Sequence, residues 1–253
     1  MFESLQQRNR YLYAQVSIEN PMILIPYPRQ CIKAQFIQRH KRFTIEAMYK
    51  GNCIWAHTNN TGSMMGLLRK GQTIFLSPAQ NSNRKLPYTL ELVNIHGMWI
   101  GVNTLTPNRI LKQAWYHKQL PELLPYNQFI SEVKYGDSRF DACVQTPHKK
   151  LWIEAKNVTL VEDEIAAFPD AITTRGQKHL KTLIQMKKDG INTALFYFIQ
   201  RIDCKCFAPA DYIDARYAEL FYDAKKEGVA IWPYQADISM QGIGIGRKLD
   251  IVG

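Results

Sequence analysis

The stretch SRFDACVQTPHKKLWIEAKNVTL, residues 138–160, decides the fold of the second half of this 253-residue chain. Apolar and polar residues alternate on both sides of TPHKK, which is the pattern of two β-strands joined by a turn. The strands also carry Asp141, Glu154 and Lys156 among large apolar residues. A core strand normally keeps charge off its buried face, because an unpaired buried ion is costly. These three charges therefore call for a chemical explanation.

Asp141, Glu154 and Lys156 are spaced so that they can converge. Glu154 and Lys156 lie two residues apart and point to the same face of their strand, and the hairpin brings Asp141 close to them. Two carboxylates at a strand end suit Mg²⁺ or Mn²⁺, a cation that keeps several waters and often takes substrate phosphate as a ligand. The metal activates a bound water, and a neighbouring ammonium orients that water and offsets developing charge. The set therefore predicts phosphodiester hydrolysis, with Asp141 and Glu154 holding the metal.

This is the spacing of the PD-(D/E)xK nuclease motif: an acid, a turn, then acid-x-Lys on the next strand. Glu132, on the preceding segment, is a further acidic candidate that would assist with metal or water. Alone, the spacing favours a plainer interpretation, a solvent-facing ion pair near a strand end, and Glu132 equally fits an ordinary exposed carboxylate. His179 lies near the start of a helix expected at 174–188, a place where nuclease-fold proteins can carry a substrate-contacting residue, but we favour the plainer interpretation, a solvated helix residue.

The pattern of apolar and polar residues divides the chain into four regions. Residues 1–22 show no clear period and stay unassigned. Residues 23–105 carry short strands at close spacing, which indicates a small closed β-barrel or sandwich. Residues 106–126 contain a helix with Thr106 at its N-cap and Pro107 at its first helical position, followed by two further prolines, and we assign them as a helical linker. Residues 127–253 alternate strands with two helices, which predicts an α/β domain with a mixed sheet.

Composition excludes some classes of protein. The chain is 46% apolar and 21% charged, enough for a proper core and a solvated surface. It has no apolar run of about 18 residues and no apolar stretch of the signal-peptide kind near residue 1, so we expect a cytoplasmic protein with no membrane partner. Its five cysteines are an odd, scattered set, which predicts reduced thiols.

Positive charge is concentrated in the first part of the chain. Residues 1–110 hold 13 Lys/Arg against 4 Asp/Glu, and residues 111–253 hold 19 against 18. This asymmetry predicts a polyanion-binding module, although a merely solvated basic surface has the same composition. Lys and Arg neutralise phosphates, and aromatic side chains stack on unpaired bases. The candidate nucleic-acid-binding residues are Arg39, Lys41, Arg42, Arg84, Lys85 and Tyr88, joined by Asn60, Thr61 and Ser63.

One of these assignments has an alternative, and two neighbouring features need an interpretation. The NTGSM run (60–64) offers backbone N–H and hydroxyl groups to a phosphate, or simply forms a tight turn. Phe43, beside the basic run, is assigned to core packing. GIGIG (242–246) is interpreted as hairpin glycines, since no helix or βαβ unit follows it.

Several runs resemble the sugar fermentation stimulation protein A family. They are ILIPYPR (23–29), NTGSMMGLL (60–68), NRKLPYTLELV (83–93), GVNT (101–104), EVKYG (132–136), SRFD (138–141), EAKNVTL (154–160), FPDA (168–171) and TTRGQKHL (173–180). The resemblance implies an N-terminal OB-fold-like barrel followed by a mixed-sheet, nuclease-like α/β domain, and DNA binding without sequence preference. It also implies a regulatory link to sugar metabolism.

The sequence therefore favours a DNA-binding protein whose second domain hydrolyses phosphodiesters with Mg²⁺ or Mn²⁺. The competing hypothesis is a non-catalytic regulator that uses the nuclease-like fold only to grip DNA. A third hypothesis is a small-molecule enzyme unrelated to nucleic acid. A measurement of salt-sensitive DNA binding would exclude it. Single- or double-stranded DNA, and a monomer or a homodimer, all fit the residues.

Overall fold

The first domain is a closed β-barrel. The computed structural model describes residues 22–253 except 63, 65 and 82, so the predictions for residues 1–21 and for Ser63 lie outside it. Five strands form the barrel: β2 (Ile32–His40), β3 (Thr44–Tyr49), β4 (Asn52–His57), β5 (Thr73–Pro78) and β6 (Tyr88–Ile95). A parallel pairing of β4 with β6 closes it, and β7 (Met98–Gly101) pairs antiparallel with β6. Alternate residues such as Ile45, Ile74 and Leu90 are fully buried inside.

The second domain is built on a mixed seven-stranded sheet, which confirms the predicted fold class. Its strands, in spatial order, are β1 (Ile25–Pro26), β16 (Gly242–Lys248), β15 (Ala230–Ile238), β13 (Asn192–Ile199), β10 (Lys150–Val158), β9 (Ser138–Gln145) and β8 (Gln128–Tyr135). The three central strands β10, β13 and β15 run parallel, and the flanking pairs are antiparallel. A parallel centre needs cover on both faces.

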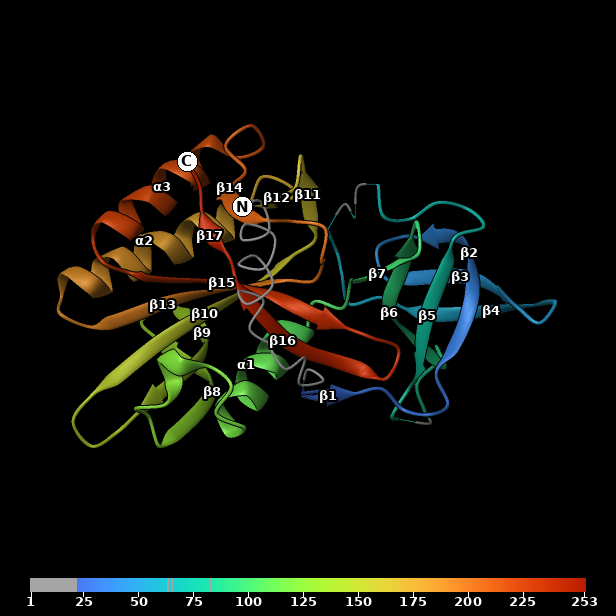
Figure 1. Ribbon diagram of the computed structural model, residues 1–253, viewed down its shortest axis with the longest axis horizontal. Coiled ribbons are helices and arrows are strands. Elements are labelled where there is room, and N and C mark those ends of the chain that lie inside the picture. Colours follow the sequence, from blue (N-terminus) through green and yellow to red (C-terminus); the bar gives the residue numbers. More distant parts are fainter. Residues whose placement is uncertain (1–21, 63, 65, 82) are drawn as a thin grey trace, which may run out of the picture.

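Helices supply that cover. The helix α1 (Thr106–Tyr116) packs on one face, while α2 (Thr174–Lys188) and α3 (Ala215–Lys226) pack on the other, as Figure 1 shows. A second, four-stranded sheet lies beside α3. It consists of β11 (Leu160–Glu162), β12 (Ile165–Phe168), β14 (Cys206–Pro209) and β17 (Asp250–Ile251). A 3-10 turn, η2 (Pro121–Leu123), follows α1.

The structure differs from the sequence prediction at two domain boundaries. The short strand β1 pairs with β16 at the edge of the large sheet, so residues 25–26 do not belong to the barrel. Residues 106–126 are more than a linker, because Ile110, Leu111 and Ala114 of α1 are fully buried in the second domain. Both differences arise from contacts with residues far away in the sequence, which local sequence patterns do not predict.

Glycines in β16 let β1 approach closely. A Cβ on Gly242 would collide with the carbonyl oxygen of Ile25, and one on Gly244 with that of Met22. The hairpin interpretation of GIGIG is therefore confirmed, since β15 and β16 pair antiparallel, and contact with another strand explains why glycine is required.

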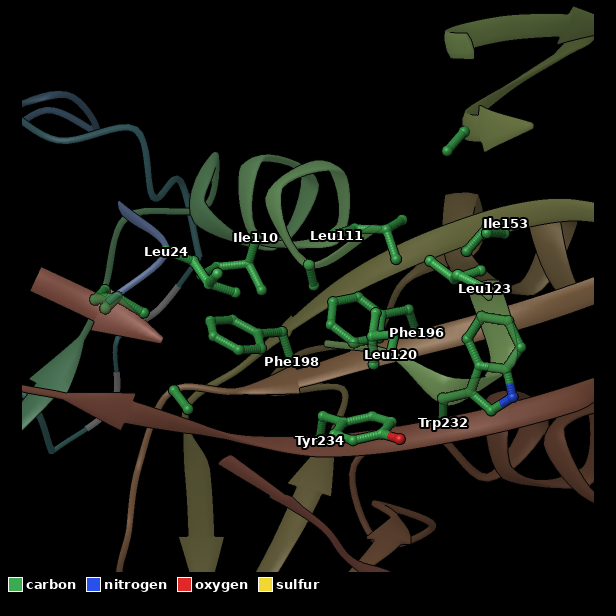
Figure 2. Close-up of a cluster of buried hydrophobic side chains, with 14 of the residues drawn as sticks. Leu24, Ile110, Leu111, Leu120, Leu123, Ile153, Phe196, Phe198, Trp232 and Tyr234 are labelled. Atoms are coloured by element: carbon green, nitrogen blue, oxygen red, sulfur yellow. The ribbon is translucent and has the colours of Figure 1, made fainter. Parts of the chain in front are cut away.

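The two domains share a hydrophobic core. One buried cluster, shown in Figure 2, joins Phe196 and Phe198 of β13 to Ile110 of α1. The same cluster contains Phe75 and Leu92, which belong to the barrel strands β5 and β6. The barrel therefore packs against the second domain through apolar side chains, so a linker is not its only connection to that domain.

Side-chain caps start both helices on the far face. The Thr173 hydroxyl accepts a hydrogen bond from the Gly176 N–H at 3.0 Å at the start of α2. At the start of α3, the Asp214 carboxylate accepts a hydrogen bond from the Tyr217 N–H at 2.9 Å. At the first helix the prediction was off by one residue: Thr106 is already helical, and Leu105 is at the cap.

We expect Asp214→Ala to lower the free energy of unfolding by about 2–3 kcal/mol. Asp214 also accepts from the Thr173 N–H and the Gln177 amide, so it ties the starts of α2 and α3 together. Burial by itself raises the pKa of Asp214, but these donors outweigh it and hold that pKa below the usual range. Its contribution is present above the ordinary Asp pKa of about 3.9 and is lost as the pH falls through the lower folded-state pKa.

Urea denaturation of the parent and of Asp214→Ala at several pH values measures this difference. The control is Asp211→Ala, which removes an exposed carboxylate three residues away. Equal stability of the two variants near neutral pH would contradict the capping role.

Two further findings complete the fold. Within residues 22–253, apart from the three omitted positions, no helix is long and apolar enough to cross a membrane. The five cysteines, all within the described residues, are free thiols, and Cys143 and Cys204 are buried.

Candidate active site and nucleic-acid surface

The strands β9 and β10 separate at the position of the predicted site. Their backbone pairing runs from Gln145–Lys150 to Ala142–Ile153. One step further, the N–H of Ala155 donates to the Asp141 carboxylate at 2.7 Å. Where the pairing of β9 with β10 ends, the Asp141 side chain therefore accepts this hydrogen bond in place of a backbone carbonyl. We call the gap that opens between the two strands at this point the fork, and the Asp141 carboxylate lies in it.

Asp141 is held from a second direction by α1. The side-chain amide of Asn108 donates to its other oxygen at 2.6 Å. Burial raises the pKa of Asp141, and the nearby charge of Glu154 raises it further. The N–H of Ala155, the Asn108 amide and the charge of Lys156 oppose these effects only in part. Two carboxylates are therefore close enough to repel each other.

Glu154 is the most buried member of the site, with 4% of its surface exposed. Its Oε1 accepts a hydrogen bond from the Lys156 ammonium at 2.7 Å and another from Nδ1 of His179. Its Oε2 is buried and has no hydrogen-bond partner among the described residues. Burial by itself raises the pKa of Glu154, but Lys156 and His179 outweigh burial and place that pKa below its usual value. Glu154 is therefore ionised.

The structure does not bring Glu132 into contact with the other three. It lies in β8 at a left-handed backbone position with φ of 52°, and its side chain is 67% exposed. Its ion pair is with Arg139, at 3.4 Å. Among the described residues there is no cluster of three His, Cys, Asp or Glu side chains suited to a metal. Glu132 thus matches the plainer alternative, an exposed carboxylate.

Sequence reasoning missed two residues of the site. His179 was interpreted as solvated, but it is 5% exposed and its ring faces Glu154 from α2. Asn108 carried no signal beyond its place in the first turn of a helix. The apolar face of α2 could have indicated His179, because Leu180 and Leu183 on that face are fully buried.

A chain of polar contacts runs from the site strand to the barrel. Asn157, next to Lys156, accepts a hydrogen bond from the buried amide of Gln200 at the end of β13. That amide also donates to the carbonyl of Asn103, at 3.2 Å. The Asn103 side chain in turn donates to Glu91 of β6, at 2.9 Å.

The predicted nucleic-acid-binding residues fall into two groups. Lys41, Arg42, Thr61 and Lys85 are exposed. Arg39 is half-buried, and its guanidinium donates to the carbonyls of Asn60 at 2.7 Å and Gly62 at 2.9 Å.

Arg84 and Tyr88 are also half-buried. The Arg84 guanidinium donates to the carbonyls of Leu86 and Tyr88 and to the Thr89 hydroxyl. Arg39 and Arg84 therefore shape the loops that present the exposed cations.

The loop after β4 reaches the second domain. Asn60 is buried, and its side-chain oxygen accepts from the Gly62 N–H at 2.8 Å, which is the geometry of a tight turn. A Cβ on Gly62 would lie 3.0 Å from a carboxylate oxygen of Asp170. The loop thus packs close against the FPDA segment.

Aromatic side chains on the outside of the barrel are more exposed than we predicted. Phe43 was assigned to the core, but it is 49% exposed and stacks on His57 at 6.1 Å between ring centroids. Trp55 of β4 is 40% exposed and lies 5.1 Å from the ring of His40. Because Trp55 and His57 alternate with the buried Ala56, the strand period could have placed both outside.

The fold and the site define a two-domain protein: an OB-type barrel joined to a mixed-sheet α/β domain with an acidic site at a strand fork. Family models agree in both parts. Residues 37–102 match the SfsA N-terminal OB domain, and residues 105–242 match the sugar fermentation stimulation protein RE domain. The chain belongs to the sugar fermentation stimulation protein (SfsA) family.

Individual relatives support this assignment. The sugar fermentation stimulation protein homolog of Syntrophobacter fumaroxidans is 52% identical, over 91% of this chain and 88% of its own. That of Maridesulfovibrio salexigens is 55% identical, over 90% and 97%. The solved structure of Pyrococcus furiosus SfsA in complex with Ca²⁺ is 25% identical, covers 91% of this chain and 99% of its own, and superposes with a TM-score of 0.84.

Proposed function

We propose that this protein binds DNA without sequence preference and hydrolyses phosphodiester bonds with a divalent cation held by Asp141 and Glu154. The observation that carries the proposal is the fork between β9 and β10, where two carboxylates and the Lys156 ammonium meet. A second carboxylate beside a buried, ionised one is electrostatically unfavourable, because each charge disfavours ionisation of the other. A cation relieves that repulsion.

The residues at the fork fit a divalent cation. Glu154 Oε2 is a buried anionic oxygen without a partner, and the pKa of Asp141 is raised by burial and by Glu154. Oxygen donors suit Mg²⁺ and Mn²⁺, which accept one or two carboxylates with water and phosphate completing their shell. The relative from Pyrococcus furiosus was solved with Ca²⁺, another cation that prefers oxygen ligands. When bound, such a cation stabilises charge on phosphate oxygens and makes a water more acidic.

The protein's own residues prepare this site. His179 and Lys156 hold one oxygen of Glu154 and leave the other unpaired. Asn108 fixes Asp141 from α1. The Lys156 ammonium, with a 12% exposed side chain, is available to orient an attacking water and to offset charge that develops on the phosphate.

The outer face of the barrel supports DNA binding. OB-type barrels bind strands across their second and third strands and the adjoining loops. In this barrel that region presents Phe43 and Trp55 next to the exposed Lys41 and Arg42. Cations neutralise phosphates and aromatic faces stack on bases.

Cleavage of end-labelled single-stranded and double-stranded DNA tests the nuclease proposal. We expect products with Mg²⁺ or Mn²⁺ and none after EDTA. A purified protein that retains DNA but gives no product from any substrate form, with either metal, would exclude hydrolysis as proposed.

A second candidate function is a DNA-binding regulator without catalysis. The observation that favours it is the direct ion pair of Lys156 with Glu154, which already neutralises one of the two carboxylates. In that case added Mg²⁺ would change neither the melting temperature nor the DNA affinity of the protein. Under the nuclease proposal, Mg²⁺ raises the melting temperature, because a ligand that binds the folded state stabilises it.

We expect Phe43→Ala and Trp55→Ala each to weaken binding of single-stranded DNA by about 5- to 100-fold, the loss of roughly one stacked base. Fluorescence anisotropy with a labelled oligonucleotide measures this effect. The matched control is Tyr116→Ala, which removes a 71% exposed aromatic from α1 in the other domain and should leave the affinity unchanged. Equal affinities for all four proteins would remove this face of the barrel from the binding surface.

A further inference from the structure

A cavity of about 470 Å³ lies where the barrel meets the second domain. Its walls come from the segment around β1, from the β5–β6 end of the barrel and from the start of α1. Clefts of this size between domains are common positions for small ligands.

The floor of the cavity holds a buried carboxylate. Glu91 is 7% exposed. One of its oxygens accepts from the Ser77 hydroxyl at 2.7 Å and the other from the Asn103 amide at 2.9 Å. Both donors are neutral, and no cation forms an ion pair with Glu91 within the described part of the chain. A carboxylate in this position retains lone pairs that can accept from a ligand hydroxyl.

A buried donor belongs to a residue of the same lining. Tyr27 is one of the lining residues, and its hydroxyl is buried and has no hydrogen-bond partner in the described residues. Burial, and then the charge of Glu91, raises the pKa of Tyr27 well above its usual value, so the phenol keeps its proton. A buried hydroxyl without a partner costs free energy, and an acceptor oxygen from a ligand removes that cost.

Two guanidinium groups complete the lining. Arg84 keeps one terminal nitrogen that donates to no described residue, while its other two nitrogens bind the loop. Arg109, on the first turns of α1, is exposed and its side chain has no partner in the described chain. Guanidinium pairs suit the planar, multiple acceptors of a phosphate.

We propose that this cavity binds a sugar phosphate, either free or as the 5′-phosphorylated terminal nucleotide of a DNA strand. Arg84 and Arg109 contact the phosphate, and Tyr27 and Glu91 contact the sugar oxygens. An apolar ligand would leave these groups unpaired, and a bare phosphate would not use Glu91, which repels anions. The inference concerns a site other than the strand fork, and its test involves no cleavage, so the two proposals can fail separately.

Isothermal titration calorimetry of the full chain with ribose 5-phosphate, glucose 6-phosphate, inorganic phosphate, and 5′-phosphorylated and 5′-hydroxyl dinucleotides tests this inference. We expect a sugar phosphate or the phosphorylated dinucleotide to bind more tightly than inorganic phosphate. Binding of free sugar phosphates identifies a metabolite site, and binding of the phosphorylated dinucleotide alone identifies a strand-end site. Failure of every sugar-containing probe to bind more tightly than inorganic phosphate overturns the inference.

Two variants localise the binding. Tyr27→Phe removes only a hydroxyl that has no partner among the described residues, so the fold should survive, and affinity should fall about 10- to 100-fold. Arg109→Ala should have an effect of similar size, whereas Lys112→Ala, which removes an exposed cation one turn along the same helix, should have none. Unchanged affinity in both Tyr27→Phe and Arg109→Ala would place the ligand elsewhere and overturn the assignment.

Discussion

Glu154→Gln is expected to lower the rate of metal-dependent DNA cleavage by at least about 100-fold while leaving DNA affinity within about twofold. The substitution keeps the volume of a side chain that is 4% exposed, but it removes the charge that a divalent cation requires. DNA affinity should persist because the aromatic and basic face of the barrel is separate from the fork. Labelled-substrate cleavage and fluorescence anisotropy on the same preparations measure the two quantities.

Glu132→Gln is the matched control for this substitution. It makes the same chemical change at a carboxylate that is 67% exposed and paired with Arg139. We expect near-parental cleavage from it. Cleavage by Glu154→Gln at the parental rate would mean that hydrolysis, if present, occurs elsewhere in the protein.

A second pair of variants guards against misfolding of Glu154→Gln. Breaking a buried ion pair typically costs about 3–5 kcal/mol, so melting curves must accompany the kinetics. Lys156→Ala removes the ammonium instead of the carboxylate and should lose a comparable share of cleavage. Lys150→Ala removes an exposed lysine from the start of the same strand and should retain activity.

Phe198→Ala is expected to lower the free energy of unfolding by about 3–5 kcal/mol, and to do so for both domains at once. Phe198 is fully buried and stacks on Phe196 at 5.8 Å between centroids. Its cluster, drawn in Figure 2, also contains the barrel residues Phe75 and Leu92. The void left by the missing phenyl ring weakens the hydrophobic core that the two domains share.

Urea denaturation followed by circular dichroism gives the loss, and hydrogen exchange in β3 and β13 shows whether the two domains open together. Phe43→Ala is the control, because it deletes the same side chain at a 49% exposed position and should cost less than about 1 kcal/mol. A barrel that keeps its exchange protection in Phe198→Ala while β13 loses it would show that the domains are energetically independent.

Local patterns predicted the regular elements well. The helix at 174–188 has the predicted bounds, because it combines a clear apolar period with a cap at its start and a glycine just beyond its end. The hairpin from residue 138 was likewise evident from alternation around TPHKK. In these segments the local and the tertiary preferences agree.

The remaining features depend on contacts that no local window contains. The burial of His179 follows from the packing of α2 over Glu154, and the role of Asn108 from the packing of α1 over Asp141. Glu132 is exposed at a left-handed backbone position. Residues other than glycine adopt this conformation rarely, so the sequence does not predict it for a glutamate. The spacing of acid and lysine identified the centre of the site, and tertiary contacts decided which residues surround it.

The pairing of β1 with β16 has a consequence for biosynthesis. Ile25 lies opposite Ile243, so one of the first strands of the large sheet to leave the ribosome pairs with one of the last. At about 5–20 residues per second, some 10–45 s separate the synthesis of the two partners. The barrel strands, which lie between residues 32 and 95, are all synthesised early in that interval, while β1 has no strand partner until its end. The edge of the second domain can therefore close only after the residues of β16 have been synthesised.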